Sequence, residues 1–496
     1  MLPPRLQTRS ASAVQPPAHQ SPILNPWTPK PNRGYAQANN AQLGGRPQAA
    51  IRSAVPFNLA LFVTALLIIN HFGRPFELFL VGFRIPAVIC FFGIIVLVAA
   101  GGLAQLLSQS GIALSALVVW LLLSATQSSW RRGSLEYTLT YIAFWVVLML
   151  MVAHAPRSAK DLIRLASVTG LACLFSIFIN GREVSDRFGA DGTFGNSDDV
   201  ALMAGYAIPF VALWALQFKN SILRYAILIL GCGYLLVAVG RTATRAAIPA
   251  LFLMLVVYFI RGQAMQRMWI LVATFVSIIG LLVFLPKSTL ERFSTIVDSF
   301  DKNTVQQMAG SSEAMASSAE RRDLLRDAFN MTLENPIFGV GSGQFAEYRF
   351  QHFRLSNGAR KHYIASHNTF LQISSESGIL ALLFYCIFLG TIYRTAARVR
   401  KLTVFSQHPD AKLFGQVSTC IEAALAYFTV CAFLMTCDRH PHQFVIAGMA
   451  IAMERLLKYW ISQHARTGPA WATPTVNFAN PVGSSTVGMS PVRFNR

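Results

Sequence analysis

Twelve long apolar runs recur along the chain and constrain its fold more than any other feature. A helix needs about 20 mainly apolar residues, usually about 17 to 25, to cross a bilayer. Several of the runs reach this length only together with their flanking residues. The sequence therefore predicts an all-α polytopic membrane protein with about twelve transmembrane helices. The runs occupy residues 55–70, 85–103, 112–125, 135–153, 162–180, 200–218, 222–239, 246–260, 269–286, 370–390, 413–435 and 444–457.

The low fraction of charged residues supports the assignment to membrane proteins. Of the 496 residues, 53% are hydrophobic and only 13% are charged, whereas a soluble domain carries about 25% charged residues. The 7 cysteines lie inside the apolar runs or at their ends. Because their spacing matches neither a metal site nor a disulfide framework, we expect them to be small buried side chains.

The net charge of +20 raises the question of nucleic-acid binding, and the distribution of that charge answers it. The first 52 residues are basic, contain no acid and are rich in Pro, Gln, Ala and Asn, which predicts a disordered tail. It is not a cleavable signal peptide, because the first apolar run begins only near Val55. The positive-inside rule places this tail in the cytoplasm.

The charges of the turns between the apolar runs indicate on which side of the membrane each turn lies. Starting from a cytoplasmic N-terminus, most turns on the cytoplasmic side are basic, as the rule requires. Arg74, Arg84, Arg131 and Arg132 fall on the other side and count against it. Topology and anionic lipid then account for the excess positive charge, and nucleic acid is not an expected partner. The basic cytoplasmic turns carry Arg157, Lys160 and Arg164; Lys219 and Arg224; Arg261 and Arg267; and Arg394, Arg398, Arg400 and Lys401.

Five segments follow from this pattern. Residues 1–52 and 460–496 are predicted to be disordered cytoplasmic tails. Residues 53–286 and 367–459 form the two parts of a transmembrane bundle. Residues 287–366 form one long periplasmic loop, and a shorter polar segment, 181–199, lies on the same side.

The long loop contains a predicted amphipathic helix and a turn. Ser317 and Glu320 have the spacing of a capping box, which marks a helix start, and apolar residues then recur at helical spacing up to Pro336. The following sequence GVGSGQF, 339–345, has alternating glycines. A dinucleotide fingerprint follows a strand and opens a helix, so we interpret this stretch as a tight turn.

Two arginines interrupt an apolar passage at an outer helix end. Arg241 and Arg245 stand in VGRTATRAAIP, where charge at membrane depth costs about 2.5–3.5 kcal/mol. One interpretation is that they reach toward phospholipid headgroups. The other is a binding site for a phosphorylated lipid, because guanidinium pairs with phosphate through two parallel hydrogen bonds.

Histidines mark two further outer helix ends. His367 precedes an apolar run beside the polar Asn368, and its near-neutral pKa suits a general base as well as a structural role. The second group is Asp438, Arg439, His440 and His442. It lacks the supporting ligands of a metal site and is interpreted as a solvated turn.

Three short motifs occur in order along the chain. Arg245 ends the stretch Arg241-Thr-Ala-Thr-Arg245, and Arg321 or Arg322 begins the loop helix that runs to Asn335-Pro336 and the glycine turn. In SHNTFLQISSESGIL, 366–380, Gly378 follows the pair His367-Asn368. With these motifs the chain resembles the O-antigen ligase/polymerase superfamily, bacterial inner-membrane enzymes that handle polyprenyl-diphosphate-linked glycans. It departs from the family pattern in having Leu325 and Ala381, and a weaker match lies at 194–197.

The resemblance implies a function and a site. It implies metal-independent glycosyl transfer, with no cofactor, at the periplasmic face of the inner membrane. The donor would be a glycan on undecaprenyl diphosphate and the acceptor a hydroxyl of lipid A-core or of another glycan. His367, Arg245 and Arg321 would be catalytic, the arginines stabilising charge on the diphosphate. Arg241, Arg322 and Asn368 would bind substrate.

Two alternatives stay open. A ligase and a polymerase share this architecture, so the sequence does not separate them. A transporter or flippase of lipid-linked glycans is the other class. Transporters often have internal repeats and a site near the bilayer midplane, whereas here the conspicuous polar groups stand at outer helix ends.

Overall fold

The structure is a computed structural model that describes residues 58–73, 85–184, 187–190, 196–284, 313–354, 358, 360–404 and 408–467. The predicted N-terminal tail, the loop segment 285–312 and residues 468–496 lie outside the described residues. The C-terminal helix continues to Thr467, so the expectation of disorder from residue 460 is wrong. The stretch 460–467 contains neither Gly nor Pro, and the sequence Gly468-Pro469 follows it, which is a common way for a helix to end.

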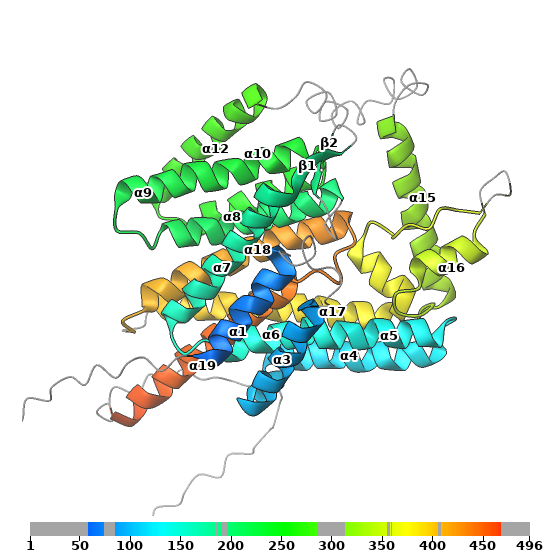
Figure 1. The fold of residues 1–496 in the computed structure, drawn as a ribbon, viewed down its shortest axis with the longest axis horizontal. Helices are drawn as coiled ribbons and strands as arrows, with labels where there is room; N and C mark the ends of the chain where they lie inside the picture. Colours follow the sequence, from blue (N-terminus) through cyan, green and yellow to red (C-terminus); the bar gives the residue numbers. More distant parts are fainter. Residues whose placement is uncertain are drawn as a thin grey trace, which may run out of the picture. The chain divides into compact units, whose positions relative to one another are not determined.

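The described residues of each of the twelve apolar runs lie largely in a helix (Figure 1). Three of these helices include a short π-helical stretch, namely η1, η4 and η6. The elements are α1 (Leu59–Ile68) with η1 (Ile69–Gly73), α3 (Ile85–Ala99), η3 (Gly102–Leu107), α4 (Gln109–Gln127), α5 (Arg131–Tyr141) with η4 (Ile142–Val146) and α6 (Val147–His154), α7 (Ala159–Asn180), β1 (Gly181–Val184), β2 (Arg187–Ala190), α8 (Ser197–Ala215), α9 (Ser221–Ala226) with η6 (Ile227–Cys232) and α10 (Gly233–Arg241), α11 (Ala247–Arg261), α12 (Ala264–Phe284), α15 (Glu313–Glu334), α16 (Phe345–His352), α17 (Thr369–Val404), α18 (Ala411–Leu434) and α19 (His442–Thr467).

Several helices are long and apolar enough to cross a membrane. In the described part of the chain there are 7 of them. Four shorter apolar helices accompany them, among them α1 with η1, and α3. The chain is therefore a helical membrane protein, and the number of twelve spans stays a prediction. The 7 helices cover Gln109–Gln127, Arg131–His154, Ala159–Asn180, Ser197–Ala215, Ser221–Arg241, Thr369–Val404 and Ala411–Leu434.

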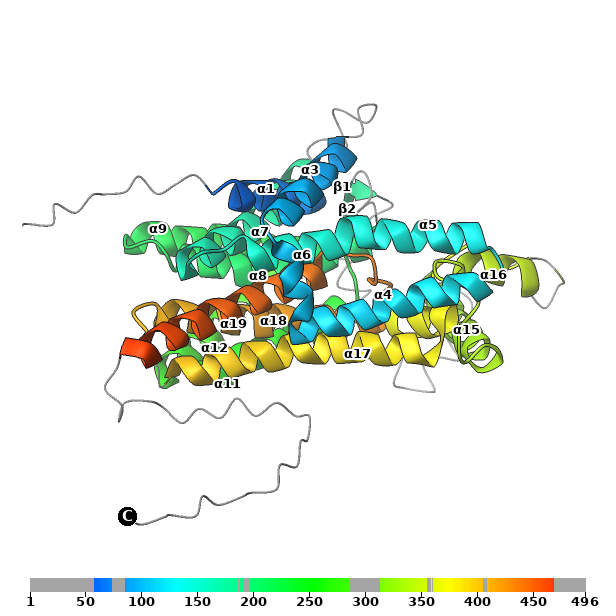
Figure 2. The same cartoon turned by 90° about the horizontal axis from the view of Figure 1, so that it is seen from below.

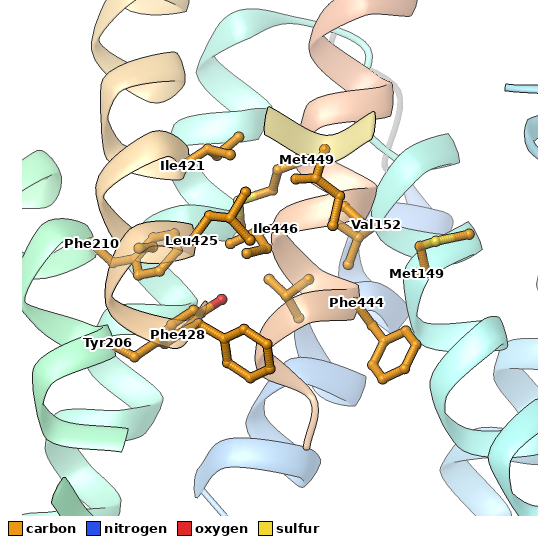
Figure 3. Packing of buried hydrophobic residues seen from close by; sticks show 14 of the residues in the cluster. Met149, Val152, Tyr206, Phe210, Ile421, Leu425, Phe428, Phe444, Ile446 and Met449 are labelled. Atoms are coloured by element: carbon orange, nitrogen blue, oxygen red, sulfur yellow. The ribbon is translucent and has the colours of Figure 1, made fainter. Parts of the chain in front are cut away.

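The centre of the bundle is built by α6, α8, α18 and α19. Figure 3 shows side chains from these helices packed together, including Tyr206, Phe428 and Phe444. Close approach requires small residues at the contacts: a Cβ at Gly448 would lie 2.6 Å from the Val152 side chain. By contrast, large apolar side chains on α12 such as Trp269 and Phe275 are exposed, as expected for a surface that faces lipid.

Ion pairs gather the predicted cytoplasmic turns at one end of the bundle. Arg261 and Arg400 both bind Glu422, at 2.7 and 3.0 Å, which joins the ends of α11 and α17 to the middle of α18. Arg398 binds Glu454 of α19 at 2.7 Å. Arg455 donates to the carbonyl of Pro156 at 2.6 Å, which adds the turn between α6 and α7. Turns far apart in sequence thus lie on one side, as the basic-turn pattern predicts.

At the other end, α15, α16 and the segment leading to residue 366 form a compact lobe beside the start of α17 (Figures 1 and 2). Leu324, Ala328, Met331, Val340 and Phe345 make its own apolar core. The helix α15 ends at Glu334, just before Pro336 as predicted, but it begins at Glu313. The predicted start at the capping box is therefore wrong, because the helix simply continues through Ser317.

The shorter polar segment, 181–199, contains a β-hairpin in which Gly181 pairs with Ala190 and Val184 with Arg187. The all-α prediction is wrong at this point. The hairpin lies at the same end as the lobe, and its Phe188 is buried, so this segment packs onto the bundle instead of extending freely.

Candidate active site

A break in helix α17 provides backbone hydrogen bonds between the bundle and the lobe. Gly378 has φ 82° and ψ 174° inside the helix, a region that side chains rarely adopt. The freed amide of Ile379 donates to the carbonyl of Pro336 at 2.8 Å, and Val340 N donates to Ser375 O at 2.9 Å. A Cβ at position 378 would lie 1.8 Å from the carbonyl oxygen of Ile337, so only glycine allows this contact.

A buried carboxylate organises the glycine turn. Glu376 is 4% exposed and accepts hydrogen bonds from Gly343 N at 2.7 Å and Phe345 N at 3.2 Å. Gly341 N also donates to its backbone carbonyl at 2.8 Å. Gly339, Gly341 and Gly343 all have positive φ. The alternating glycines therefore make a tight turn that docks on α17, as the sequence interpretation expected.

Two backbone positions near the candidate residues are strained. Among the described residues, Ala243 (φ 51°) and His367 (φ 55°) are the non-glycine residues with positive φ. Such conformations cost about 1–3 kcal/mol each and often occur at functional sites. Ala243 lies in the turn that carries Arg245, and His367 is itself a candidate.

Hydrogen bonds on both sides hold His367 in place. Ser366 N donates to the side chain of Gln372 at 2.9 Å. The amide of Asn368 accepts from Leu371 N at 2.9 Å and donates to Phe433 O at 2.9 Å. Both polar ends of the Asn368 side chain are therefore engaged with the protein, and its contact with substrate stays a prediction.

An ion pair links the lobe to the bundle next to His367. Arg321 Nη2 lies 3.0 Å from Oδ2 of Asp198 at the start of α8. The other oxygen of this buried carboxylate accepts from Thr244 Oγ1 at 2.8 Å. Asp198 thus connects Arg321 to the turn that carries Arg245, and two of the predicted motifs come together through a residue that the sequence analysis missed.

The surroundings of Arg322 and Arg241 differ from those of Arg321. Arg322 is exposed, whereas Arg321 binds Asp198, which favours Arg321 as the arginine of the motif. The guanidinium carbon of Arg241 lies 5.1 Å from the centre of the Phe188 ring in the β-hairpin. None of the four predicted arginines is among the residues that line the cavity next to His367. Arg321 is joined to one of these residues, Asp198.

That cavity has a volume of about 460 Å³, within the usual range of ligand pockets. His367 and Asp198 form one wall and the turn between α18 and α19 forms another. Both polar segments of the sequence therefore reach it. Its lining residues are Thr140, Trp145, Asn196, Asp198, Asp199, Ala365, His367, Met435, Thr436, Asp438, Arg439, His440 and Pro441.

The group Asp438 to His442 is only partly the solvated turn that was expected: Arg439 is exposed, but its neighbours are not. Asp438 is 9% exposed and His442 is fully buried. The hydroxyl of Tyr137 donates to Asp438, the Arg439 guanidinium carbon lies 4.6 Å from the Tyr137 ring centre, and His440 Nε2 lies 3.7 Å from Asp199 Oδ1. The turn is drawn inward because it meets these partners. A charged group between two apolar runs was the signal available in the sequence.

Burial and neighbouring charges determine the protonation state of His367. Burial lowers its pKa from the ordinary value, and the positive charge of Arg321 lowers it further, against the opposing effect of Asp198 and Glu320. A lowered pKa keeps the imidazole neutral, and thus able to accept a proton, to a lower pH. The half-buried ring lines the cavity, so a bound hydroxyl can reach it.

The described residues contain no group of three or more His, Cys, Asp and Glu side chains placed to hold a metal ion. The predicted independence from metal stays a prediction.

Comparison with known proteins places this geometry in a family. A family model described as O-antigen ligase matches residues 230–386. The matched region contains Arg241, Arg245, Arg321 and His367. No curated protein matches the chain significantly. Residues 230–386 are therefore similar to the O-antigen ligase family, in agreement with the resemblance carried by the three motifs.

Proposed function

We propose that the protein is an inner-membrane glycosyltransferase that moves a glycan from an undecaprenyl-diphosphate donor to a sugar hydroxyl on the periplasmic face. The observation that carries the proposal is that a strained, half-buried His367 shares one cavity wall with Asp198, the partner of Arg321. The match of residues 230–386 to the family model described as O-antigen ligase supports the same reaction class.

The proposed reaction uses His367 as the base. The neutral imidazole accepts the proton of the acceptor hydroxyl while the acceptor oxygen bonds to the anomeric carbon of the donor glycan. The bond from that carbon to the diphosphate oxygen breaks, and the diphosphate leaves with the electron pair. Negative charge grows on the diphosphate during this step.

Arg321 and Arg245 supply the opposing positive charge. Asp198 holds Arg321 on one side and Thr244, the neighbour of Arg245, on the other. Fixed cationic groups stabilise a developing charge without reorganisation at the moment of reaction. In this scheme the arginines do the work that a metal ion does in other glycosyltransferases, which is why we propose metal independence.

The acceptor is the part of the proposal that a genetic experiment resolves. Deletion of the gene is expected to leave bare lipopolysaccharide core if the protein is a ligase. Core capped with a single repeat unit indicates a polymerase of O-antigen, and unchanged lipopolysaccharide with a lost exopolysaccharide indicates a polymerase of that polymer. The measurement is the pattern of surface glycans on a gel.

Purified protein in lipid vesicles tests the reaction itself. His367→Ala is expected to lower glycan transfer about 10²–10⁴-fold, the usual contribution of a general base. Arg326→Gln is the matched control, because Arg326 lies on the exposed face of α15. Near-normal transfer by the His367 variant, with an unchanged thermal unfolding curve, would remove His367 from the mechanism. Movement of intact donor across the vesicle without transfer would favour the transporter or flippase.

A further inference from the structure

Four charged side chains are packed together inside the lobe. Arg349 of α16 places Nε 2.7 Å from Asp327 Oδ2 and Nη2 3.1 Å from Asp323 Oδ2. Lys361 Nζ lies 2.9 Å from Asp327 Oδ2 and 2.8 Å from Asp323 Oδ2. We call these residues the ion cluster. Both aspartates belong to α15, so the cluster joins α15 to α16 and to the segment that leads to His367.

The ion cluster is buried more than its charge would favour. The side chains of Arg349, Asp327 and Lys361 are 3%, 4% and 9% exposed, whereas that of Asp323, at the edge of the cluster, is 40% exposed. Burying charges costs desolvation energy, and apolar replacements of similar volume are often equally stable. The best-attested use of such groups is to fix one arrangement among several that packing would permit. The question is therefore which arrangement this cluster fixes.

On α15, the ion cluster fixes the rotation of the helix. With about 3.6 residues per turn, Arg321 falls at one edge of the buried face and Asp323 and Asp327 fall at the other edge. The exposed Arg322 and Arg326 lie on the opposite side. Holding the two aspartates therefore turns Arg321 toward Asp198.

The ion cluster also binds the segment of chain just before His367. Lys361 stands six residues ahead of His367 in the sequence. Arg349 Nη1 also donates to the carbonyl of His362 at 2.9 Å, and His362 Nδ1 lies 3.6 Å from Glu320 Oε1, beside Arg321. One buried group thus restrains both of the segments that carry the candidate residues.

We infer that the ion cluster is a positioning device that holds Arg321 and His367 at a fixed separation without touching the substrate. The inference rests on the proposed function of these two residues. Its consequence is that a change at the cluster acts on the reaction step and on the surroundings of His367, even though the cluster lies outside the cavity.

The first experiment compares Lys361→Met, Lys361→Arg and Arg326→Met in purified protein with the undecaprenyl-diphosphate glycan as donor. Small misplacements of catalytic groups can cost about 100-fold in rate, so Lys361→Met is expected to lower kcat on that order. The KM for donor should stay within about two-fold, because the lost interaction is not a substrate contact. Lys361→Arg keeps the charge and is expected to restore most of kcat, and Arg326→Met to leave it unchanged.

The second experiment does not depend on glycan transfer. The rate of acylation of His367 by diethyl pyrocarbonate, followed by mass spectrometry across pH, reports its pKa. When α15 is released, Arg321 moves away while Asp198 stays on α8, so the pKa of His367 should rise in Lys361→Met. Glu320 would leave with α15 and oppose this change, but its influence is smaller than that of Arg321. The other titratable groups facing the cavity, Asp199, Asp438, Arg439 and His440, lie on α8 and the turn before α19 and stay in place.

The outcomes separate the two proposals. A raised pKa of His367 in Lys361→Met, in protein that transfers no glycan even as wild type, would support the positioning role and reject the proposed reaction. An unchanged pKa together with unchanged kcat would overturn the positioning role alone. If Lys361→Met loses its cooperative unfolding transition, Arg349→Lys carries the same test, because it keeps the charge but loses the fork that grips two carboxylates at once. An unchanged pKa and kcat in that folded variant would also overturn the inference.

Discussion

His367 is the residue whose surroundings make the sharpest prediction about pH. Its pKa is lowered by burial and by Arg321, and the neutral ring is the form that accepts a proton. Activity should therefore fall with decreasing pH only below the ordinary histidine value of about 6.5. The measurement is the dependence of kcat/KM on pH, and an acid limb centred above that value would contradict the assignment.

Asp198→Asn should shift the pH profile of kcat/KM. The carboxylate of Asp198 raises the pKa of His367, so its removal should lower that pKa further and move the acid limb to lower pH. Asp161→Asn is the control, since Asp161 pairs with the exposed Arg164 at the far end of the bundle. A shift toward higher pH would mean that Asp198 acts mainly by holding Arg321 in place.

Gly378 allows a prediction with a control in the same helix. Gly378→Ala would place a Cβ 1.8 Å from Ile337 O at a φ of +82°, so it should destabilise the docked lobe by at least about 1–3 kcal/mol. Gly390→Ala meets nothing within 4 Å and should be neutral or stabilising. Thermal unfolding in detergent and protease cleavage within 336–352 measure both, and equal behaviour of the variants would show that the break in α17 is not required.

At the scale of elements, the lobe depends on one buried carboxylate. Glu376→Gln replaces an acceptor of two backbone N–H groups with an amide whose NH₂ cannot accept from Gly343. The expected cost is about 1–3 kcal/mol, the usual penalty for an unsatisfied buried group. The protease assay used for Gly378→Ala checks it, with Glu334→Gln at the exposed end of α15 as control, and an unchanged cleavage rate would contradict it.

The elements also show why sequence reasoning succeeded locally and failed at longer range. The end of α15 before Pro336 and the tight turn at 339–345 follow from signals that act within a few residues, and both were predicted. The contact of Arg321 with Asp198 joins residues 123 positions apart, and no local pattern encodes it. The inward position of Asp438 likewise depends on Tyr137, a residue of another helix.

For the whole molecule, the order of apolar runs predicted the helical bundle because burial in a membrane requires long apolar helices that satisfy their own backbone groups. It also placed the basic turns on one side, and the ion pairs of Glu422 and Glu454 with arginines from separate helices agree. The sequence could not give the cavity, whose walls come from four separate parts of the chain. Sequence analysis identified His367, which lines the cavity, because a motif contains that residue. It missed Asp198 and Asp199 because acidic residues at this position are also typical of the polar start of a membrane span.

Orientation in the membrane is a prediction of the whole molecule. If the positive-inside rule holds here, the turn between α11 and α12 faces the cytoplasm and the lobe faces the periplasm. A cysteine replacing exposed Gln263 in that turn should react with a membrane-impermeant maleimide only after the inner membrane is opened, whereas one replacing Arg326 in the lobe should react in intact spheroplasts. Cys386 is the exposed native cysteine among the described residues, and its replacement by serine removes background. The reverse labelling pattern would put the cavity in the cytoplasm and would reject a periplasmic transfer, because the donor glycan would then have to react before crossing the membrane.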